Sequence, residues 1–378
     1  MGKRKTFIFG SVALFLVLAM LLGCSKQATT TTTPAQKTTE KIVEKTVTAM
    51  KPLPSILRFA ANAGLNSDVA TSLAAALQQQ LGTKTTVETA SSQINSLLLV
   101  RSGQSELWET STSTLLDPLK GVGDYSKPEW GPQPLRTLIE GELLPAGLWT
   151  TSKTGIKTMQ DIKGKRVAYF PGSSTINDTI TAIFEAHGFT YNDVKKVNFD
   201  SSAESWDGVQ NGTVDVALGG FKTAKLTEVD ATVGLWIIPF TQSPEVAEKW
   251  AKLRPQPLVQ IKAGEFAGVK VDMIQPASMH VVAAYNSMND DIAYQITKGL
   301  YGSMDQIQKV AVTANWTKTG STRLPLLAPF HSGSIKFFKE VGLWTAEHDK
   351  AQQDQLQSEQ ERMAAWKAKL TATTTATK

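Results

Sequence analysis

Short apolar runs alternate with stretches of helical periodicity along most of this 378-residue chain, and a polar or glycine-containing turn follows each run. The first run spans residues 56–60 and its turn spans residues 62–67. One helix face follows, with an apolar residue every four positions: Val69, Leu73, Leu77 and Leu81. The next strand and capped helix are predicted at residues 85–89 and 91–101. Such a repeated unit implies parallel strands joined by right-handed crossovers, so the predicted fold class is α/β.

The same unit is clearest in the middle of the chain. Residues 165–170 predict a strand, residues 171–175 a loop of small polar residues, and the helix that follows ends at Gly188. Farther on, residues 214–218 predict a buried strand, and the glycines of residues 219–221 allow the backbone to turn sharply.

Three such loops therefore lie between the end of a strand and the start of a helix. Free N–H groups and the positive end of the helix dipole converge there, which suits a carboxylate or another small anion. In open α/β sheets, ligands bind at the carboxyl ends of the strands. Ordinary helix capping also explains each loop taken singly. The prediction of a binding site depends on several loops together.

The first 24 residues have the layout of an export signal. Lys3, Arg4 and Lys5 precede an apolar run at residues 7–22, which is short for a membrane span. The only cysteine of the chain, Cys24, ends this segment. The stretch resembles the lipobox of bacterial lipoproteins, in which the chain is cut before the cysteine and the thiol carries lipid. Leu22 departs from the smaller residue that the family prefers. The alternative is an uncleaved anchor with a chance cysteine.

A tether is predicted after this signal. Residues 25–52 contain five consecutive threonines and almost no apolar side chain, so they cannot bury enough surface to fold. Residues 1–23 are thus predicted to be the signal peptide and residues 24–52 a lipidated, disordered spacer. The rest of the chain is then extracytoplasmic and anchored to a bacterial membrane, in the periplasm or on the outer face of the cytoplasmic membrane.

Charge and motif content argue against several classes of function. Removal of the three basic residues of the signal lowers the formal net charge from +5 to +2, and no basic cluster interleaved with aromatic residues predicts nucleic-acid binding. The chain lacks a G-x-S-x-G elbow, an H-E-x-x-H pair and a P-loop. Its four histidines have no metal-ligand spacing, and a structural role is predicted for His187 and His331. We therefore expect no enzyme, no cofactor and no metal.

Six segments share a further pattern: residues 155–168, 171–175, 211–217, 263–268, 291–298 and 329–340. In the same order they resemble the TAXI family, the extracytoplasmic receptors of TRAP transporters with the type II periplasmic-binding-protein fold. The resemblance covers roughly residues 55–344. Three segments depart from the family: residues 62–67 contain a single glycine and no tyrosine, residues 106–110 replace the family's Q-S-D, and Phe266 replaces a tyrosine.

The resemblance implies two α/β lobes, each a mostly parallel sheet flanked by helices, joined by a hinge around a ligand cleft. Lobe I would comprise residues 53–147 and 260–344, and lobe II residues 148–259. The crossings would then fall near residues 145–150 and 256–262. About 290 residues between Pro52 and Leu343 suit two such lobes. Residues 345–378 are predicted to form a polar, mostly solvated helix with a frayed end.

The implied function is that of a monomeric receptor that delivers a small organic anion, a carboxylate or an amino acid, to a TRAP membrane permease. One alternative is an ABC-type binding lipoprotein similar to those for sulfonates, nitrate or thiamine precursors. Another is a sensory or structural lipoprotein that has lost its ligand. The ligand's carboxylate would meet the loop at residues 173–175. The predicted binding residues are Asn62, Gly64, Ser92, Gln93, Asn95, Trp108, Ser173, Ser174, Thr175, Gly219, Gly220 and Phe221.

Overall fold

The computed structural model describes residues 49–171, 174–254 and 256–376. Cys24, nearly all of the predicted tether and Ser173 lie outside these residues. Within the described part of the chain, no helix has the length and apolar character needed to cross a membrane.

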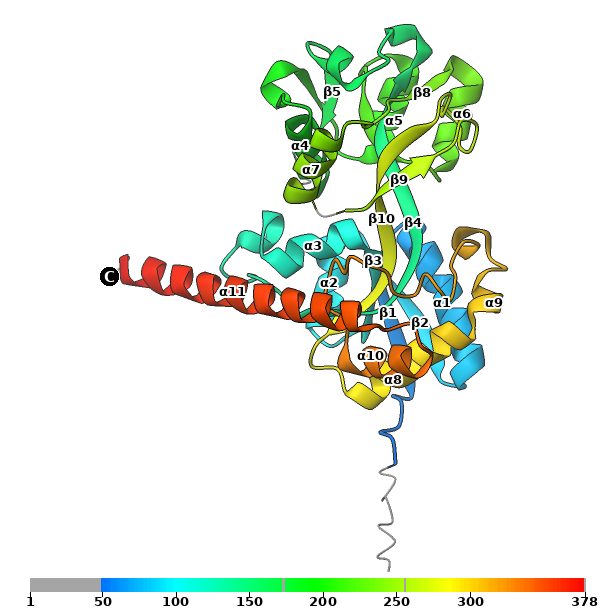
Figure 1. The fold of residues 1–378 in the computed structure, drawn as a ribbon, viewed down its shortest axis with the longest axis vertical. Coiled ribbons are helices and arrows are strands. Elements are labelled where there is room, and N and C mark those ends of the chain that lie inside the picture. Colours follow the sequence, from blue (N-terminus) through cyan, green and yellow to red (C-terminus); the bar gives the residue numbers. More distant parts are fainter. Residues whose placement is uncertain (1–48, 172–173, 255, 377–378) are drawn as a thin grey trace, which may run out of the picture. The chain divides into compact units, whose positions relative to one another are not determined.

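Lobe I is built around the sheet order β2-β1-β3-β10-β4, with helices packed on it (Figure 1). The three N-terminal strands pair in parallel, whereas β10 runs antiparallel to both of its neighbours. The strands are β1 (Ile56–Asn62), β2 (Lys84–Ala90), β3 (Leu107–Ser111), β4 (Leu135–Thr151) and β10 (Met273–Tyr285). The helices are α1 (Leu65–Leu81), α2 (Gln93–Arg101), α3 (Thr112–Lys120), α8 (Asp290–Gly302), α9 (Met304–Ile307) and α10 (Ser332–Glu340), with 3-10 turns at Gly123–Ser126 and Ala311–Thr313.

Lobe II contains short strands. Some of them pair with each other, and the others pair with the parts of the long strands β4 and β10 that lie in this lobe. The strands β5 (Arg166–Tyr169) and β6 (Lys195–Asn198) form a parallel pair. The others are β7 (Ala217–Gly220), β8 (Leu235–Ile237) and β9 (Leu258–Ile261). The helices are α4 (Ser174–Ala186), α5 (Ser202–Asn211), α6 (Ala224–Val233) and α7 (Pro244–Leu253), with 3-10 turns at Ser152–Thr154, Met159–Ile162 and Tyr191–Asp193.

Two long strands connect the lobes, as Figure 1 shows. β4 pairs with β10 as far as Pro145, and from Ala146 onward with β7 and β8. β10 begins in lobe II, where it pairs with β9 as far as Pro276, and continues into lobe I from Ala277. The predicted two-lobe α/β fold with a hinge is confirmed, and the connection consists of extended backbone in the two strands.

The second crossing lies later in the chain than predicted. It falls at Pro276–Ala277 rather than at residues 256–262, because Ile261, Val269 and Met273 are buried in the core of lobe II. The strand β9 completes that core by pairing with the start of β10. Residues 258–275 therefore belong to lobe II.

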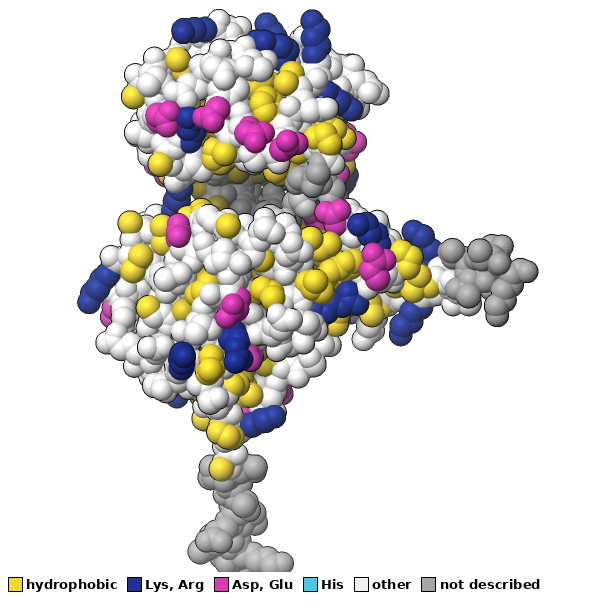
Figure 2. Space-filling model, turned by 180° about the vertical axis from the view of Figure 1, so that it is seen from behind, with side chains coloured by type: hydrophobic (Ala, Val, Ile, Leu, Met, Phe, Trp, Pro, Cys, Tyr) yellow, Lys and Arg dark blue, Asp and Glu magenta, His cyan; other side chains and the backbone are white. Residues whose placement is uncertain are grey.

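Each lobe has its own apolar core. Lobe II is filled around large aromatic side chains such as Trp149, Phe184 and Phe240. In lobe I the strands alternate, so Phe59 enters one core layer with Trp316 while the adjacent Ala60 enters the layer on the opposite face. Acidic and basic side chains are interspersed over the face drawn in Figure 2, in line with the small net charge.

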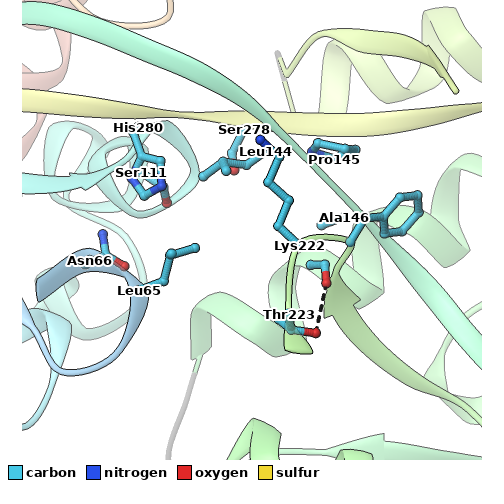
Figure 3. A pocket seen from close by; sticks show the side chains of 12 residues that line it. Leu65, Asn66, Ser111, Leu144, Pro145, Ala146, Lys222, Thr223, Ser278 and His280 are labelled. Atoms are coloured by element: carbon cyan, nitrogen blue, oxygen red, sulfur yellow. Dashed lines mark hydrogen bonds between the residues drawn. The ribbon is translucent and has the colours of Figure 1, made fainter. Parts of the chain in front are cut away.

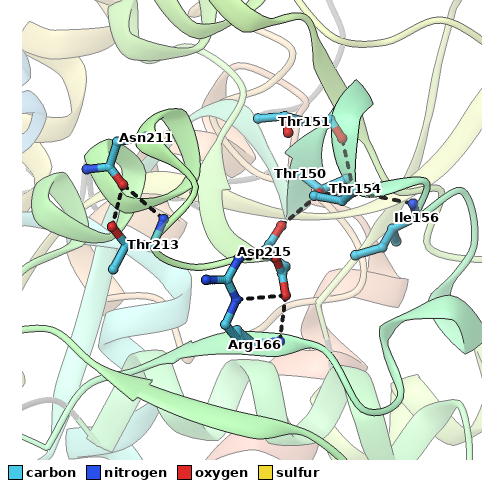
Figure 4. A network of polar contacts seen from close by, with 8 residues as sticks. All are labelled: Thr150, Thr151, Thr154, Ile156, Arg166, Asn211, Thr213 and Asp215. Atoms are coloured by element: carbon cyan, nitrogen blue, oxygen red, sulfur yellow. Dashed lines mark hydrogen bonds and ion pairs between the residues drawn. The ribbon is translucent and has the colours of Figure 1, made fainter.

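Two of the family-like segments meet in a structural ion pair (Figure 4). Nη2 of Arg166 lies 2.6 Å from Oδ1 of Asp215, and the backbone N–H of Arg166 donates to Oδ2 at 2.9 Å. The backbone carbonyl of Asp215 accepts from the hydroxyl of Thr150 at 2.6 Å, which ties the segment to the end of β4. These residues of the two TAXI-like segments thus have a structural role, because they stabilise the sheet of lobe II.

Asp215→Asn is expected to lower the melting temperature by a few degrees at pH 7. Burial raises the pKa of Asp215, but the side-chain and backbone hydrogen bonds from Arg166 outweigh it and hold the pKa below its usual value. A lowered pKa in the folded state gives stability that is present above the unfolded value of about 3.9 and lost as the pH falls through the folded value. Thermal unfolding at pH 7 and pH 3 should therefore show the two proteins converging in acid. An equal difference at both pH values would contradict this account.

The C-terminal segment forms one long helix, α11 (Ala346–Ala376), which continues past the point where fraying was predicted. Its polar side chains bind lobe I instead of facing only solvent. Gln352 exchanges hydrogen bonds with the backbone N–H and carbonyl of Phe330 at 2.8 and 2.9 Å. Glu359 receives two bonds from Arg136, at 2.6 and 3.0 Å. More than half of the helix residues with described side chains are exposed, and the polar contacts with lobe I lie along one side of the helix.

Candidate functional site

Two adjoining cavities lie between the lobes. The first, here the His280 cavity, has a volume of about 170 Å³ and is drawn in Figure 3. The second, here the Thr175 cavity, has a volume of about 180 Å³. Both are lined by Ser111, Ala146 and Ser278, so they share a wall at the hinge strands. Each is large enough for several water molecules or a small organic molecule.

Four of the twelve predicted binding residues line these cavities. Gly220 and Phe221 line the His280 cavity from lobe II. Gln93 and Thr175 line the Thr175 cavity from opposite lobes. The ring of Phe221 lies edge-on to Phe266, with 5.8 Å between centroids, so the phenylalanine at the position of the family's tyrosine packs behind the cavity wall.

Four residues of the lobe I loops serve local backbone geometry instead and line neither cavity. Gly64 begins α1 with a φ of 94°, which only glycine adopts easily. The hydroxyl of Ser92 caps α2 by accepting the N–H of Asn95 at 3.3 Å. The side chain of Asn95 donates to Ser91 at 3.1 Å, and that of Asn62 to the carbonyl of Ala63 at 3.3 Å. Helix capping, the alternative stated for these loops, describes the contact of Ser92.

Trp108 and Gly219 have packing roles. Trp108 is 0% exposed, and its indole N–H donates to the hydroxyl of Ser96 at 3.0 Å, so it belongs to the lobe I core and offers no face to either cavity. A Cβ at Gly219 would collide with the indole of Trp149. Ser174 begins α4, and Ser173 lies outside the described residues.

Eight of the thirteen residues that line the Thr175 cavity carry a hydroxyl or an amide group. Its polar members come from both lobes: Gln93, Ser111, Ser113, Thr114, Thr175, Thr179, Gln256 and Ser278. The hydroxyl of Thr175 donates to Oδ2 of Asp117 at 2.6 Å, which links α4 of lobe II to α3 of lobe I. The hydroxyl hydrogen of Thr175 therefore neither caps a helix nor is free to bind a ligand.

A buried arginine stands beside this cavity. Arg254 is 8% exposed, and its Nε and Nη2 have no hydrogen-bond partner. Its carbonyl accepts from the N–H of Gln256, which lines the cavity, at 2.7 Å. Burial raises the pKa of Asp117, and the bond from Thr175 and the charge of Arg254 oppose that rise. Burial and then the charge of Arg254 lower the pKa of Lys120, so Arg254 faces the end of α3.

The His280 cavity contains a buried acid–histidine pair that the sequence analysis did not identify. Nδ1 of His280 on β10 lies 2.6 Å from Oε1 of Glu109 on β3, and neither side chain is more than 1% exposed. His280 lines the cavity (Figure 3), and its Nε2 is buried without a hydrogen-bond partner. Lys222, from the lobe II side of the same cavity, forms an ion pair with Glu142.

Two other histidines, His187 and His331, have structural roles, because both ring nitrogens of each have partners within the chain. Both ring nitrogens of His187 contact backbone carbonyls, of Ile183 at 2.7 Å and of Phe240 at 2.6 Å. Those of His331 contact Met288 and Gly333. Among the residues that the structure describes, no group of three or more metal-ligating side chains is found.

Residues 65–342 match the NMT1-like family. The chain belongs to that family. The family that matches is not the TAXI family that the six segments resemble.

Solved structures similar to this NMT1-like protein include two sulfonate-binding proteins. The aliphatic sulphonate-binding protein SsuA of Escherichia coli is 14% identical, with 77% of this chain and 88% of that chain covered and a TM-score of 0.45. The alkanesulfonate-binding protein of Xanthomonas axonopodis pv. citri, bound to MOPS, is 15% identical, with coverages of 79% and 96% and a TM-score of 0.43. PhnD1 of Prochlorococcus marinus, in complex with methylphosphonate, is 11% identical, with coverages of 77% and 99% and a TM-score of 0.48. Likeness at this level concerns the fold and not the ligand.

Proposed function

We propose that this chain is an extracytoplasmic receptor for a small organic oxyanion, which binds in the adjoining cavities between the lobes. The observation that carries the proposal is Arg254, a buried guanidinium with two unpartnered nitrogens, which lines neither cavity but lies two residues before Gln256 of the Thr175 cavity. A buried donor without an acceptor is costly, and a bound oxyanion that reaches Arg254 would remove that cost. Hydroxyl and amide groups from both lobes would bind its remaining oxygens.

Ligand binding would favour a closed arrangement of the lobes. Only that arrangement gives the ligand contacts from both sides, and a ligand shifts a conformational equilibrium by its difference in affinity for the two states. The bond between Thr175 and Asp117 already joins the lobes beside the cavity. Small torsional changes in β4 and β10 near Pro145 and Pro276 would provide the hinge.

The transporter partner is proposed to be an ABC-type permease. The NMT1-like match supports this alternative better than the TRAP interpretation, which the six TAXI-like segments keep as the second candidate. Uptake of the identified ligand into membrane vesicles separates the two. An ABC system requires ATP, whereas a TRAP system requires an ion gradient and works without ATP.

Cys24→Ser is expected to abolish lipid attachment and release the protein from the membrane. The lone cysteine behind an apolar run motivates this prediction. Attached acyl chains would replace the signal as anchor, and more than one chain is needed for firm retention. Metabolic labelling with a fatty acid followed by fractionation measures both effects. Label that persists in the Cys24→Ser protein would contradict the prediction.

The receptor function is tested by calorimetric titration and thermal shift with acetate, methanesulfonate, methylphosphonate and L-glutamate. A ligand present at 100 times its dissociation constant should stabilise the folded state by about 2.7 kcal/mol. Stabilisation by at least one of these oxyanions supports the proposal. Failure of all four to bind would contradict it and favour a sensory or structural role without a ligand.

A further inference from the structure

The pair formed by Glu109 and His280 has two buried polar atoms without a hydrogen-bond partner, Oε2 of Glu109 and Nε2 of His280. Nδ1 of His280 is engaged by Glu109, whereas Nε2 is buried, unpartnered and part of the wall of the His280 cavity. The ring is held in place by Trp316 on its other side, with 6.4 Å between ring centroids and 30° between planes. Nε2 of His348 also lacks a partner, but His348 lines neither cavity.

The number of protons on the pair follows from its burial. Burial raises the pKa of Glu109, while the charge and hydrogen bond of His280, and then the side chain of Asn66, oppose the rise. A net charge on a fully buried pair is unfavourable, so the pair is expected to be neutral overall. Two neutral arrangements exist, a glutamate with an imidazolium and a glutamic acid with an imidazole. They differ only in which side of the 2.6 Å contact holds the shared proton.

In both arrangements Nε2 carries a hydrogen. Its N–H is therefore a donor without an acceptor, and an unsatisfied buried donor is costly. Other polar groups of the same wall are the side chains of Asn66, Ser111 and Ser278, and the cation of Lys222 is already paired with Glu142. A water molecule in the cavity can accept this hydrogen bond in the unliganded protein, and an acceptor atom of a ligand can replace that water.

We infer that His280, positioned by Glu109, donates its Nε2–H to an oxygen of the bound ligand, and that Glu109 keeps His280 in this donor form. This inference rests on the proposed receptor function, because it assigns one contact within the same site. The ligand class that fits is a molecule with an acceptor oxygen at the lobe I wall, such as a carboxylate, a sulfonate, a phosphonate or a carbonyl compound.

The protonation of His280 is measurable on the unliganded wild-type protein. Nitrogen-15 NMR of the histidine-labelled, folded chain at pH 7 should show Nε2 of His280 bearing a proton, with the resonance assigned by its loss in His280→Gln. A bare Nε2 at pH 7 would overturn the inference without any ligand. Glu109→Gln should allow the other tautomer, so part of the Nε2–H signal should be lost in that variant.

The ligand contact is tested with the four oxyanions named above. The Nε2 resonance should move on saturation with whichever of them binds, and His280→Gln should weaken that binding about tenfold to a hundredfold. The matched control is His331→Gln, because His331 is equally buried but has both ring nitrogens bound to its own chain. That variant should bind the oxyanion with unchanged affinity.

The possible failures are distinguishable. If an oxyanion binds while the His280 resonance and the affinity of His280→Gln stay unchanged, the receptor proposal stands and the His280 contact is wrong. If none of the four binds, the receptor proposal fails, and the contact that rests on it fails with it.

Discussion

Arg254→Ala is expected to weaken oxyanion binding about a hundredfold, or about 2.7 kcal/mol. The arginine offers two unpartnered, buried nitrogens next to the Thr175 cavity, and no other cation beside that cavity is buried to this extent among the described residues. Truncation removes charge-assisted hydrogen bonds to the ligand, which are about twice as strong as neutral ones. Calorimetric titration with an oxyanion that binds the wild type measures the loss.

The same variant should not lower the melting temperature of the unliganded protein. Without ligand the guanidinium is desolvated and unpartnered, so its removal relieves a cost, which offsets the attraction between Arg254 and Asp117. Lys249→Ala is the matched control, since Lys249 lies on the same helix and forms only an exposed pair with Glu245, at 2.9 Å. It should leave both affinity and stability nearly unchanged. Arg254→Ala with wild-type affinity would place the ligand elsewhere.

The periodicity of the sequence was sufficient to predict the class of fold. Alternation of strands with amphipathic helices predicted the α/β lobes, and the loops at residues 62–67 and 171–175 follow strands as predicted, whereas Gly219 and Gly220, predicted as a turn, lie within β7. Periodicity does not reveal which lobe a strand joins. β9 is a short apolar run that could pair in either lobe, and it lies in lobe II because the long strand β10 begins there.

The candidate site was predictable where it depends on one loop and not where it depends on pairing between distant strands. Thr175 lies in the first turn of the helix after β5, Gly220 is the last residue of β7 and Phe221 follows it, so their positions after apolar runs singled them out. Glu109 and His280 are 171 residues apart, and only the register between β3 and β10 brings them together. Arg254 resembles a solvated residue at the end of a helix, where a cation is favoured by the helix dipole, so nothing local indicates its burial.

The contacts of α11 with lobe I were not predicted from the sequence, for a related reason. Sequence analysis detects helix faces that bury apolar side chains, whereas this helix binds through Gln352, Gln355 and Arg362, which donate to backbone carbonyls of lobe I. The family match ends at residue 342, before α11 begins. The helix is therefore an addition to the part of the chain that matches the family, and its attachment can be tested separately.

Glu359→Ala is expected to destabilise the attachment of α11 by about 3–5 kcal/mol, because removal of one partner leaves a buried charge uncompensated. Arg136 and Glu359 have side-chain exposures of 11% and 12%, and their two hydrogen bonds are the charged anchor between β4 and the helix. Limited proteolysis should cut the variant near residue 345 under conditions that leave the wild type intact, and thermal unfolding should begin at a lower temperature.

Asp354→Ala is the control for this experiment, since Asp354 lies on the same helix in an exposed pair with Lys350, at 2.8 Å. Such pairs contribute about 0.3–0.5 kcal/mol, so protection from the protease should be retained.

The release of α11 should also affect the binding site. Arg362 of α11 donates to the carbonyl of Leu119 on α3, the helix whose Asp117 holds Thr175 across the lobes. Glu359→Ala should therefore weaken oxyanion binding, while equal protease sensitivity of the two variants would show that the Arg136 pair does not hold the helix.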